Sequence, residues 1–294
     1  MSDYVLSCCS SCDLTNDWIK KRDISYISFN VTVDGTPRKD DMGLTFSPWD
    51  LYELMANGSE CKTSQVSIGE YMDYFEGFAK EGKNVLHISL SSGISGTVNS
   101  ANQAGQMIME KYPDFKIIVV DSLAASSGYG LLMELAADKR DEGLSMEELA
   151  KWVEDNRLTV NHWFFSTDLT YYIKGGRVSK TAGMVGQVLN ICPLLNVDLK
   201  GRLIAREKIR TKKKVVKRIV EKMIESADGG LNYSGKCFLS DSDKELGNEV
   251  IALIEELMPQ LKGKIQHFDI GCTIGAHTGP GTVALFFVGK ERID

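Results

Sequence analysis

The sequence has no apolar run long enough to cross a membrane and no excess of positive charge. None of its 294 residues lies in a stretch approaching the roughly 18 consecutive apolar residues of a membrane-spanning helix, so we expect no integral membrane segment. The formal net charge is −6. Because a general nucleic-acid binder needs a basic surface, this balance argues against nucleic acid as a partner. The first residues also lack the basic and apolar regions of a signal peptide, which predicts a cytoplasmic protein.

Cysteine is present, but not in the pattern of a disulfide scaffold or a zinc site. The seven cysteines are few and scattered for a chain of this length. Cys9 and Cys12 form a C-x-x-C pair with Cys8 beside it, whereas a structural zinc site would need a second pair at similar spacing. We therefore expect no metal. A redox dithiol is the alternative to a loop that merely carries these cysteines.

Nucleotide-binding signatures are also missing. Neither G-x-x-x-x-G-K-[ST] nor the dinucleotide-binding G-x-G-x-x-G occurs. We therefore expect no nucleotide site of these two kinds and no cofactor.

The composition and the order of the expected elements indicate an α/β fold with two domains. With 43% apolar and 25% charged residues, the chain resembles an ordinary globular protein. In residues 1–160, strands alternate with helices, which predicts a mostly parallel sheet with helices on both faces. Residues 161–294 predict an α/β domain with a mostly antiparallel sheet, and the boundary between the two is soft. The expected strands include 24–33, 85–90 and 282–288, and the expected helices include 182–190 and 212–226.

The loop Ser91–Thr97 is the stretch that most strongly indicates a binding site. It follows the apolar run 85–90, which is expected to be a buried strand, and it precedes a helix. The first amides of a helix have no partners within the helix, and the helix dipole adds partial positive charge there. The hydroxyls and amides of this loop, with Ser92, Ser95 and Gly96 as candidate contacts, predict a small neutral site for a carboxylate or a phosphate.

Three further stretches are richer in Ser, Thr, Gly, His and Arg than a fold requires. They are Thr63–Gln65, Gly175–Arg177 and Gly275–Gly281. The first can also be a turn before a helix, and the second a helix C-cap with a solvated arginine. The third is expected to be a Gly-rich loop that carries His277, for which a structural role and a binding role are both open.

A serine hydrolase is the alternative that these residues leave open. Ser95, Asp121 and His277 follow the chain order of an α/β-hydrolase triad. The elbow signature of that fold is G-x-S-x-G, however, and here Gly93 and Ser95 are followed by Thr97 at the place of the last glycine. A hydrolase acting on acyl esters with Ser95 and His277 therefore stands beside simple recognition of a carboxylate without chemistry on the protein.

Taken together, these stretches resemble the DegV family of bacterial fatty-acid-binding proteins. The resemblance covers essentially the whole chain and rests on six motifs, which are Thr63–Gln65, Leu90–Thr97, Val120–Ser122, Gly175–Arg177, Arg210-Thr211 and His277–Gly281. It implies a fold in which one long-chain fatty acid (C14–C18, palmitate for example) is buried between the two domains. It also implies a lipid-binding carrier without catalytic activity of its own.

The resemblance further implies roles for individual residues and a partner. Thr63 and Ser95 would bind the carboxylate, and His277 would lie near the head group. Arg177 would serve partner docking or a local ion pair. Better-understood members resemble the lipid-carrying subunit of a bacterial fatty acid kinase, so the implied partner is a separate ATP-dependent kinase subunit that phosphorylates the carboxylate.

One position departs from the family pattern. Family members usually have Thr-Asp-Ser and then Ala-Asp-Leu after the first strand, whereas here Cys9 takes the place of the first Asp. If that Asp supports the head-group pocket, its replacement changes the electrostatics of the pocket or its coupling to a kinase. The sequence leaves the role of Cys8, Cys9 and Cys12 open.

Overall fold

A four-stranded parallel sheet forms the first layer of the protein. The computed structural model describes residues 4–178 and 191–294. The strand order of this sheet is β2-β1-β6-β7, and all its neighbouring strands are parallel, which confirms the prediction for the first half of the chain. Its strands are β1 (Tyr4–Cys9), β2 (Ile24–Ile27), β6 (Asn84–Ser89) and β7 (Ile117–Asp121).

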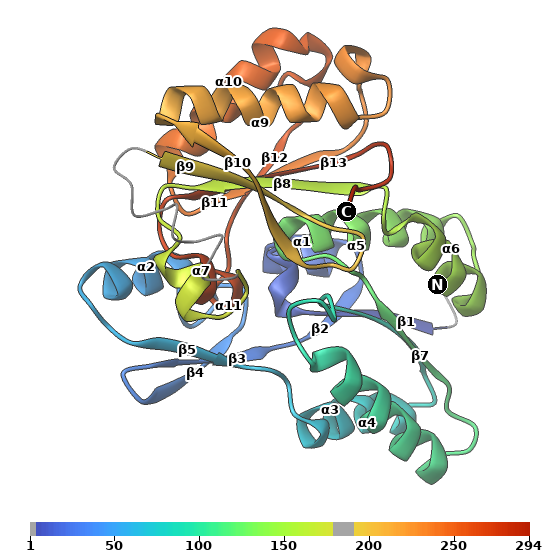
Figure 1. Ribbon diagram of the computed structural model, residues 1–294. Helices are drawn as coiled ribbons and strands as arrows, with labels where there is room; N and C mark the ends of the chain where they lie inside the picture. The colour runs from blue at the N-terminus through green and yellow to red at the C-terminus, as the bar shows by residue number, and fades with distance from the viewer. Residues whose placement is uncertain (1–3, 179–190) are drawn as a thin grey trace.

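Helices cover both faces of the parallel sheet, α3 and α4 on one face and α5 and α6 on the other (Figure 1). The helix starts follow directly from the sequence, because Ser67 with Glu70 and Ser145 with Glu148 form the capping boxes of α3 and α6. The four helices are α3 (Ile68–Lys80), α4 (Thr97–Lys111), α5 (Ser126–Asp141) and α6 (Met146–Asn156).

A six-stranded sheet forms the second layer, with the order β10-β9-β8-β13-β11-β12. All its neighbouring strands are antiparallel except β11 and β12, so the predicted mostly antiparallel sheet is confirmed. One face packs against α9 (Lys212–Ser226) and α10 (Lys244–Leu257), and the other is turned toward α5 (Figure 1). The strands are β8 (Val160–Ser166), β9 (Ile191–Val197), β10 (Leu203–Arg210), β11 (Cys237–Asp241), β12 (Gln266–Asp269) and β13 (Thr282–Val288).

A small antiparallel sheet with the order β4-β3-β5 corrects the prediction of one strand over 24–33. The chain leaves the parallel sheet after Ile27 and starts β3 at Phe29, whose amide donates to Ser10 Oγ at 3.1 Å. Asp34 and Gly35 both have positive φ, as a two-residue hairpin turn requires, and this Asp-Gly signal predicts the missed hairpin. The strands are β3 (Phe29–Val33), β4 (Thr36–Asp40) and β5 (Cys61–Ser64).

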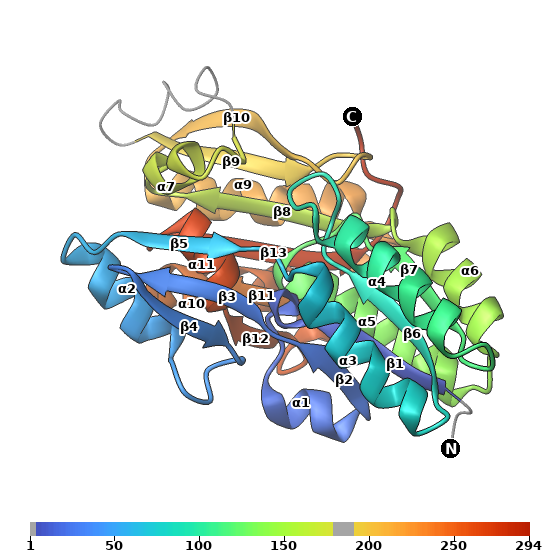
Figure 2. The same ribbon diagram turned by 90° about the horizontal axis from the view of Figure 1, so that it is seen from below.

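Two short helices carry stretches that the sequence singled out. Helix α7 (Thr170–Lys174) has Gly175 at its C-cap, which is one of the alternatives expected for Gly175–Arg177, whereas His277 lies on α11 (Cys272–Thr278) rather than in the predicted Gly-rich loop. Buried residues of α11 join those of β3 and α2 (Pro48–Ala56) in one apolar cluster, so the small sheet is tied to the C-terminal part of the chain (Figure 2). The predicted helix 182–190 lies outside the described residues.

The remaining elements are short, and no membrane-spanning helix is found. Within residues 4–178 and 191–294, no helix is both long and apolar enough to cross a bilayer. The short elements are η1 (Ser10–Cys12), α1 (Asn16–Lys21), η2 (Gly230–Asn232) and η3 (Pro259–Leu261). The division at residue 160 stays a prediction.

Candidate functional site

A cavity of about 230 Å³ lies between the carboxyl ends of the parallel strands and the inner face of the six-stranded sheet. Leu90, at the end of β6, contributes to one wall, and Phe164 on β8 contributes to another. Most of its lining is apolar, including Phe29, Leu90, Ile94, Phe164, Val197, Ile270, Ile274, Ala284 and Phe286. Both halves of the chain therefore supply apolar side chains, as the resemblance implies for a lipid tail. The sequence did not indicate which residues these are.

Thr63 and His277 meet in the polar part of this cavity. Thr63 Oγ1, at the end of β5, lies 2.6 Å from Nε2 of His277, near the end of α11. The packing of α11 against β5 brings these two elements together from opposite halves of the chain (Figure 2). The structure therefore places Thr63 and His277 next to each other, as the resemblance implies.

Burial keeps the imidazole of His277 neutral at pH 7. Desolvation, and then the nearby positive charge of Arg177, lower the pKa of His277 from 6.5 to about 4. Gly175 packs against its Nδ1, and a side chain at that position would overlap the ring. The glycine of the Gly175–Arg177 motif therefore has a steric reason beyond a helix C-cap.

The Ser91–Thr97 loop supplies Ser95 and Gly96 to the cavity, but not Ser92. Ser95 Oγ accepts from the amide of Thr97, the first residue of α4, at 3.3 Å. Ser92 is exposed, does not line the cavity, and its amide donates to Asp121 Oδ1 at 3.1 Å. Ser92, which the sequence predicted as a ligand contact, therefore lies outside the cavity, because the loop turns this residue outward.

Gln65 connects the Ser91–Thr97 loop with Thr63. Its Nε2 donates to Ser100 Oγ on α4 at 3.0 Å. Its Oε1 lies so close to Gly96 that a Cβ there would be only 2.6 Å away. The Gln65 side chain thus packs directly against Gly96, and both residues line the cavity.

Arg177 lines the same cavity, at its boundary with an external depression that Gly93 and Arg202 also line. Its Nη1 donates to the carbonyl of Gly175. Among the described residues it makes no ion pair, so the local ion pair expected for it is not found there. Burial lowers the pKa of its guanidinium, which still remains charged at pH 7. Arg177 thus lies at the cavity, close to His277, whereas a residue that served only partner docking would lie on the outer surface.

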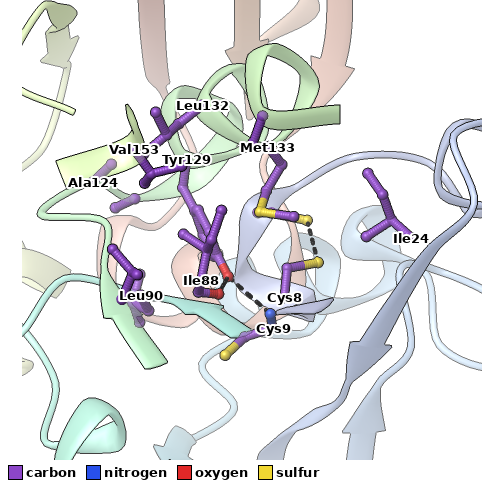
Figure 3. Packing of buried hydrophobic residues seen from close by; sticks show 14 of the residues in the cluster. Cys8, Cys9, Ile24, Ile88, Leu90, Ala124, Tyr129, Leu132, Met133 and Val153 are labelled. Atoms are coloured by element: carbon purple, nitrogen blue, oxygen red, sulfur yellow. Dashed lines mark hydrogen bonds between the residues drawn. The ribbon is translucent and has the colours of Figure 1, made fainter. Parts of the chain in front are cut away.

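The three cysteines near the N-terminus are buried in the apolar core and do not line the cavity. Figure 3 shows Cys8 and Cys9 in this core. The thiols of Cys8 and Cys12 are hydrogen-bonded at 3.8 Å and form no disulfide. Cys9 donates its amide to Tyr129, and its Sγ lies 3.3 Å from the hydroxyl of Tyr71. Within the described ranges, no cluster of His, Cys, Asp and Glu is arranged to hold a metal ion.

Tyr71 links Cys9 to the binding loop. Its hydroxyl lies 3.0 Å from Thr97 Oγ1, at the start of α4. The Cys9 thiol is therefore connected to the start of α4 through this tyrosine. Burial is the main reason why the pKa of Cys9 is raised, so the thiol is uncharged at pH 7.

The geometry does not assemble a Ser-His-Asp triad. His277 Nε2 is bonded to Thr63 rather than to Ser95. The carboxylate of Asp121 accepts from the amides of Ser92 and Leu123 and thereby shapes two loops. No Asp orients the imidazole within the part of the chain that the structure describes, and the serine hydrolase interpretation is therefore not supported.

These features define an α/β protein with a mostly apolar cavity between two sheets. The chain belongs to the DegV family, whose model, described as an uncharacterised protein family of that name, matches residues 9–290. A DegV domain-containing protein of Clostridium perfringens is 34% identical over 293 residues, which cover 99% of each chain. The sequence prediction of the family is therefore confirmed.

Solved structures of DegV proteins share the fold. A protein from Eubacterium ventriosum, described as a stearic-acid-binding protein, matches with a TM-score of 0.87 and 25% identity over 98% of each chain. The fatty acid kinase B3 protein of Streptococcus pneumoniae, loaded with linoleic acid, matches with a TM-score of 0.83 and 23% identity over 99% of this chain and 100% of that one. Because its identity is only 23%, the Streptococcus pneumoniae match shows that the fold is shared and no more.

Proposed function

We propose that this protein binds one long-chain fatty acid of the C14–C18 class in the cavity and presents its carboxylate to a separate fatty acid kinase. The observation that carries the proposal is a mostly apolar cavity with Thr63, Ser95 and His277 in its lining. Its apolar walls suit an alkyl chain, and its polar groups suit a single anionic head. The related protein of Eubacterium ventriosum, described as a stearic-acid-binding protein, supports the same ligand class.

The affinity comes mainly from the alkyl chain. Each methylene removed from water contributes about 0.8 kcal/mol, so a dozen give roughly 10 kcal/mol before the cost of ordering the ligand. The head group then needs only to avoid the penalty of burying an unpaired carboxylate, which is several kcal/mol. The polar side chains of the cavity serve this second purpose.

We assign the head group to Thr63 and Ser95, with His277 beside them. The Thr63 hydroxyl already has a hydrogen-bond partner in His277, which fixes its position before the ligand arrives. Ser95 and Gly96 place the head group at the start of α4, where the helix dipole favours an anion. The positive charge of Arg177 at the same cavity offsets part of the cost of burying an anion.

Phosphorylation of the carboxylate requires a second protein in this proposal. The sequence has no recognised ATP-binding motif, and the cavity is lined mostly by apolar groups. We therefore assign this chain the role of carrier and assign the ATP-dependent step to a separate kinase subunit. The external depression beside Arg177 is the place where the head group comes closest to a partner.

Comparison of palmitate with its methyl ester tests the proposed function. Delipidated protein is titrated with each ligand, and bound ligand is counted by native mass spectrometry. We expect one palmitate per chain and at least about tenfold weaker binding of the ester, because the ester has no charge for the polar groups to stabilise. Failure to bind palmitate would contradict the proposal, and ester hydrolysis that disappears in Ser95→Ala would restore the hydrolase alternative.

A further inference from the structure

We infer that Phe286 and His162 close the inner end of the cavity and set the longest acyl chain that fits. The inference deepens the proposed function and rests on it. It concerns which fatty acids bind, whereas the residues discussed above concern only the head group.

The floor of the cavity is formed by alternate residues of β13. Thr282, Ala284 and Phe286 all line it, because side chains two residues apart point to the same face of a strand. Thr282 is next to the head-group region, since its hydroxyl lies 3.4 Å from the carbonyl of Thr278, which follows His277. At about 3.3 Å per residue, Phe286 lies roughly 13 Å further along the strand.

Strand β8 repeats this arrangement beside β13. Phe164 pairs with Ala284, and His162 pairs with Phe286. Phe164 and His162 also line the cavity. The two paired rows show that the cavity floor runs along both strands, from the hydroxyl of Thr282 to an aromatic pair.

The aromatic pair has no free space behind it. The rings of His162 and Phe286 are 5.2 Å apart and meet edge to face at 83°. Gly128 on α5 packs directly against both rings, so that even a methyl group there would overlap them. Helix α5 therefore forms a solid wall behind the pair, and an alkyl chain that follows the floor stops at these rings.

His162 is suited to an apolar wall despite its polar ring. Its Nδ1 bonds to the carbonyl of Val160 at 2.9 Å, which fixes the ring and places the proton on that nitrogen. Only 2% of the residue is exposed, and this burial lowers the pKa of the imidazole well below 6.5. The ring is therefore uncharged at pH 7 and can contact the end of an alkyl chain.

The neighbouring residue Phe287 provides a matched control. Phe286 and Phe287 are both fully or almost fully buried on β13, but they point to opposite faces of the sheet. Phe287 belongs to the separate core beneath α9 and α10 and does not line the cavity. Truncation of either ring removes a similar volume from a core, but only truncation of Phe286 lengthens the cavity.

The test measures chain-length selectivity. Delipidated wild type, Phe286→Leu and Phe287→Leu are each loaded from an equimolar mixture of saturated acids from C12 to C20, and bound acids are quantified by native mass spectrometry. For Phe286→Leu we expect the ratio of C18 to C16 to rise about tenfold, the factor given by burial of two further methylenes. The ratio should be unchanged in Phe287→Leu.

A second variant tests the inference in the opposite direction. Ala284→Leu places a larger side chain in the middle of the floor and should shift the bound acids toward C12 and C14. The inference is wrong if neither Phe286→Leu nor Ala284→Leu changes the profile, or if Phe287→Leu changes it as much. A wild type that binds none of the acids contradicts the proposed function itself, so the two failures are distinguishable.

Discussion

Thr63 and His277 are hydrogen-bonded at 2.6 Å although 214 residues separate them in the chain. This contact joins the end of a short antiparallel sheet to a helix from the C-terminal part. Because both side chains line the cavity, the contact orders the head-group site before any ligand is present. The predictions below follow from this site and its surroundings.

Removal of the Thr63 hydroxyl should weaken binding without loss of the fold. Thr63→Val keeps the shape and the β-branch but removes a hydrogen bond to a charged ligand, which is worth about 1.5–3 kcal/mol. We expect palmitate to bind at least about tenfold more weakly in an equilibrium titration. Thr32→Val on the adjacent strand β3 is the control, since Thr32 does not line the cavity. Equal affinities of the two variants would remove Thr63 from the site.

Ser95 and Ser92 should behave differently although they are three residues apart. Ser95→Ala removes a hydroxyl that lines the cavity, and we expect weaker palmitate retention after gel filtration. Ser92 is exposed and contributes only its amide to the loop, so Ser92→Ala should retain palmitate like wild type. A loss of retention in Ser92→Ala would mean that the loop adopts a different orientation when ligand is bound.

The imidazole of His277 should be neutral in the ligand-free protein above about pH 4. Its pKa is lowered from 6.5 to about 4, so the folded protein binds fewer protons than the unfolded chain between these values. The stability contributed by this group is therefore complete above pH 6.5 and falls as the pH is lowered toward 4. Bound palmitate should raise the pKa of His277, because the carboxylate favours the charged ring.

An NMR titration of the four histidines checks this behaviour of His277. The signal is assigned by its disappearance in His277→Gln, and its pH dependence is followed with and without palmitate. A pKa near 6.5 in the ligand-free protein, or no change when ligand is added, would contradict the site geometry.

Much of this architecture could be read from local sequence signals. The capping boxes at Ser67 and Ser145 gave the starts of α3 and α6 correctly, because a capping box depends only on residues three apart. The chain's departure after Ile27 from one sheet into another could not be read in the same way. Both strands are apolar and β-branched, and only the pairing partners separate them.

The candidate site was predictable only in part, for the same reason. Thr63, Ser95, Gly96, Arg177 and His277 stood out because their motifs are rich in Ser, Thr, Gly, His and Arg, and all five line the cavity. The apolar walls carry no such signal, because a phenylalanine that faces a ligand has the same pattern as one that faces the core. Helix α11 was missed as well, since Gly275 within it and Gly279 directly after it made the segment resemble a loop.

The cysteines should be largely unreactive in the native protein. Six of the seven are buried, and only Cys61 is partly exposed. Burial raises the pKa of the Cys8 and Cys9 thiols, so little of the reactive thiolate is present at pH 7. With an aromatic disulfide reagent we expect at most one fast-reacting thiol, which is lost in Cys61→Ser, and seven after unfolding. Fast reaction of Cys8 or Cys12 would instead support the redox interpretation.

The central claim is that this chain carries a fatty acid, and native mass spectrometry of the purified protein tests it most directly. The intact complex is weighed, and the ligand is then extracted and identified. We predict one C14–C18 fatty acid per chain, with the mass of the complex exceeding that of the chain by that ligand. A protein that is empty as purified and that also fails to take up palmitate or oleate would contradict the account.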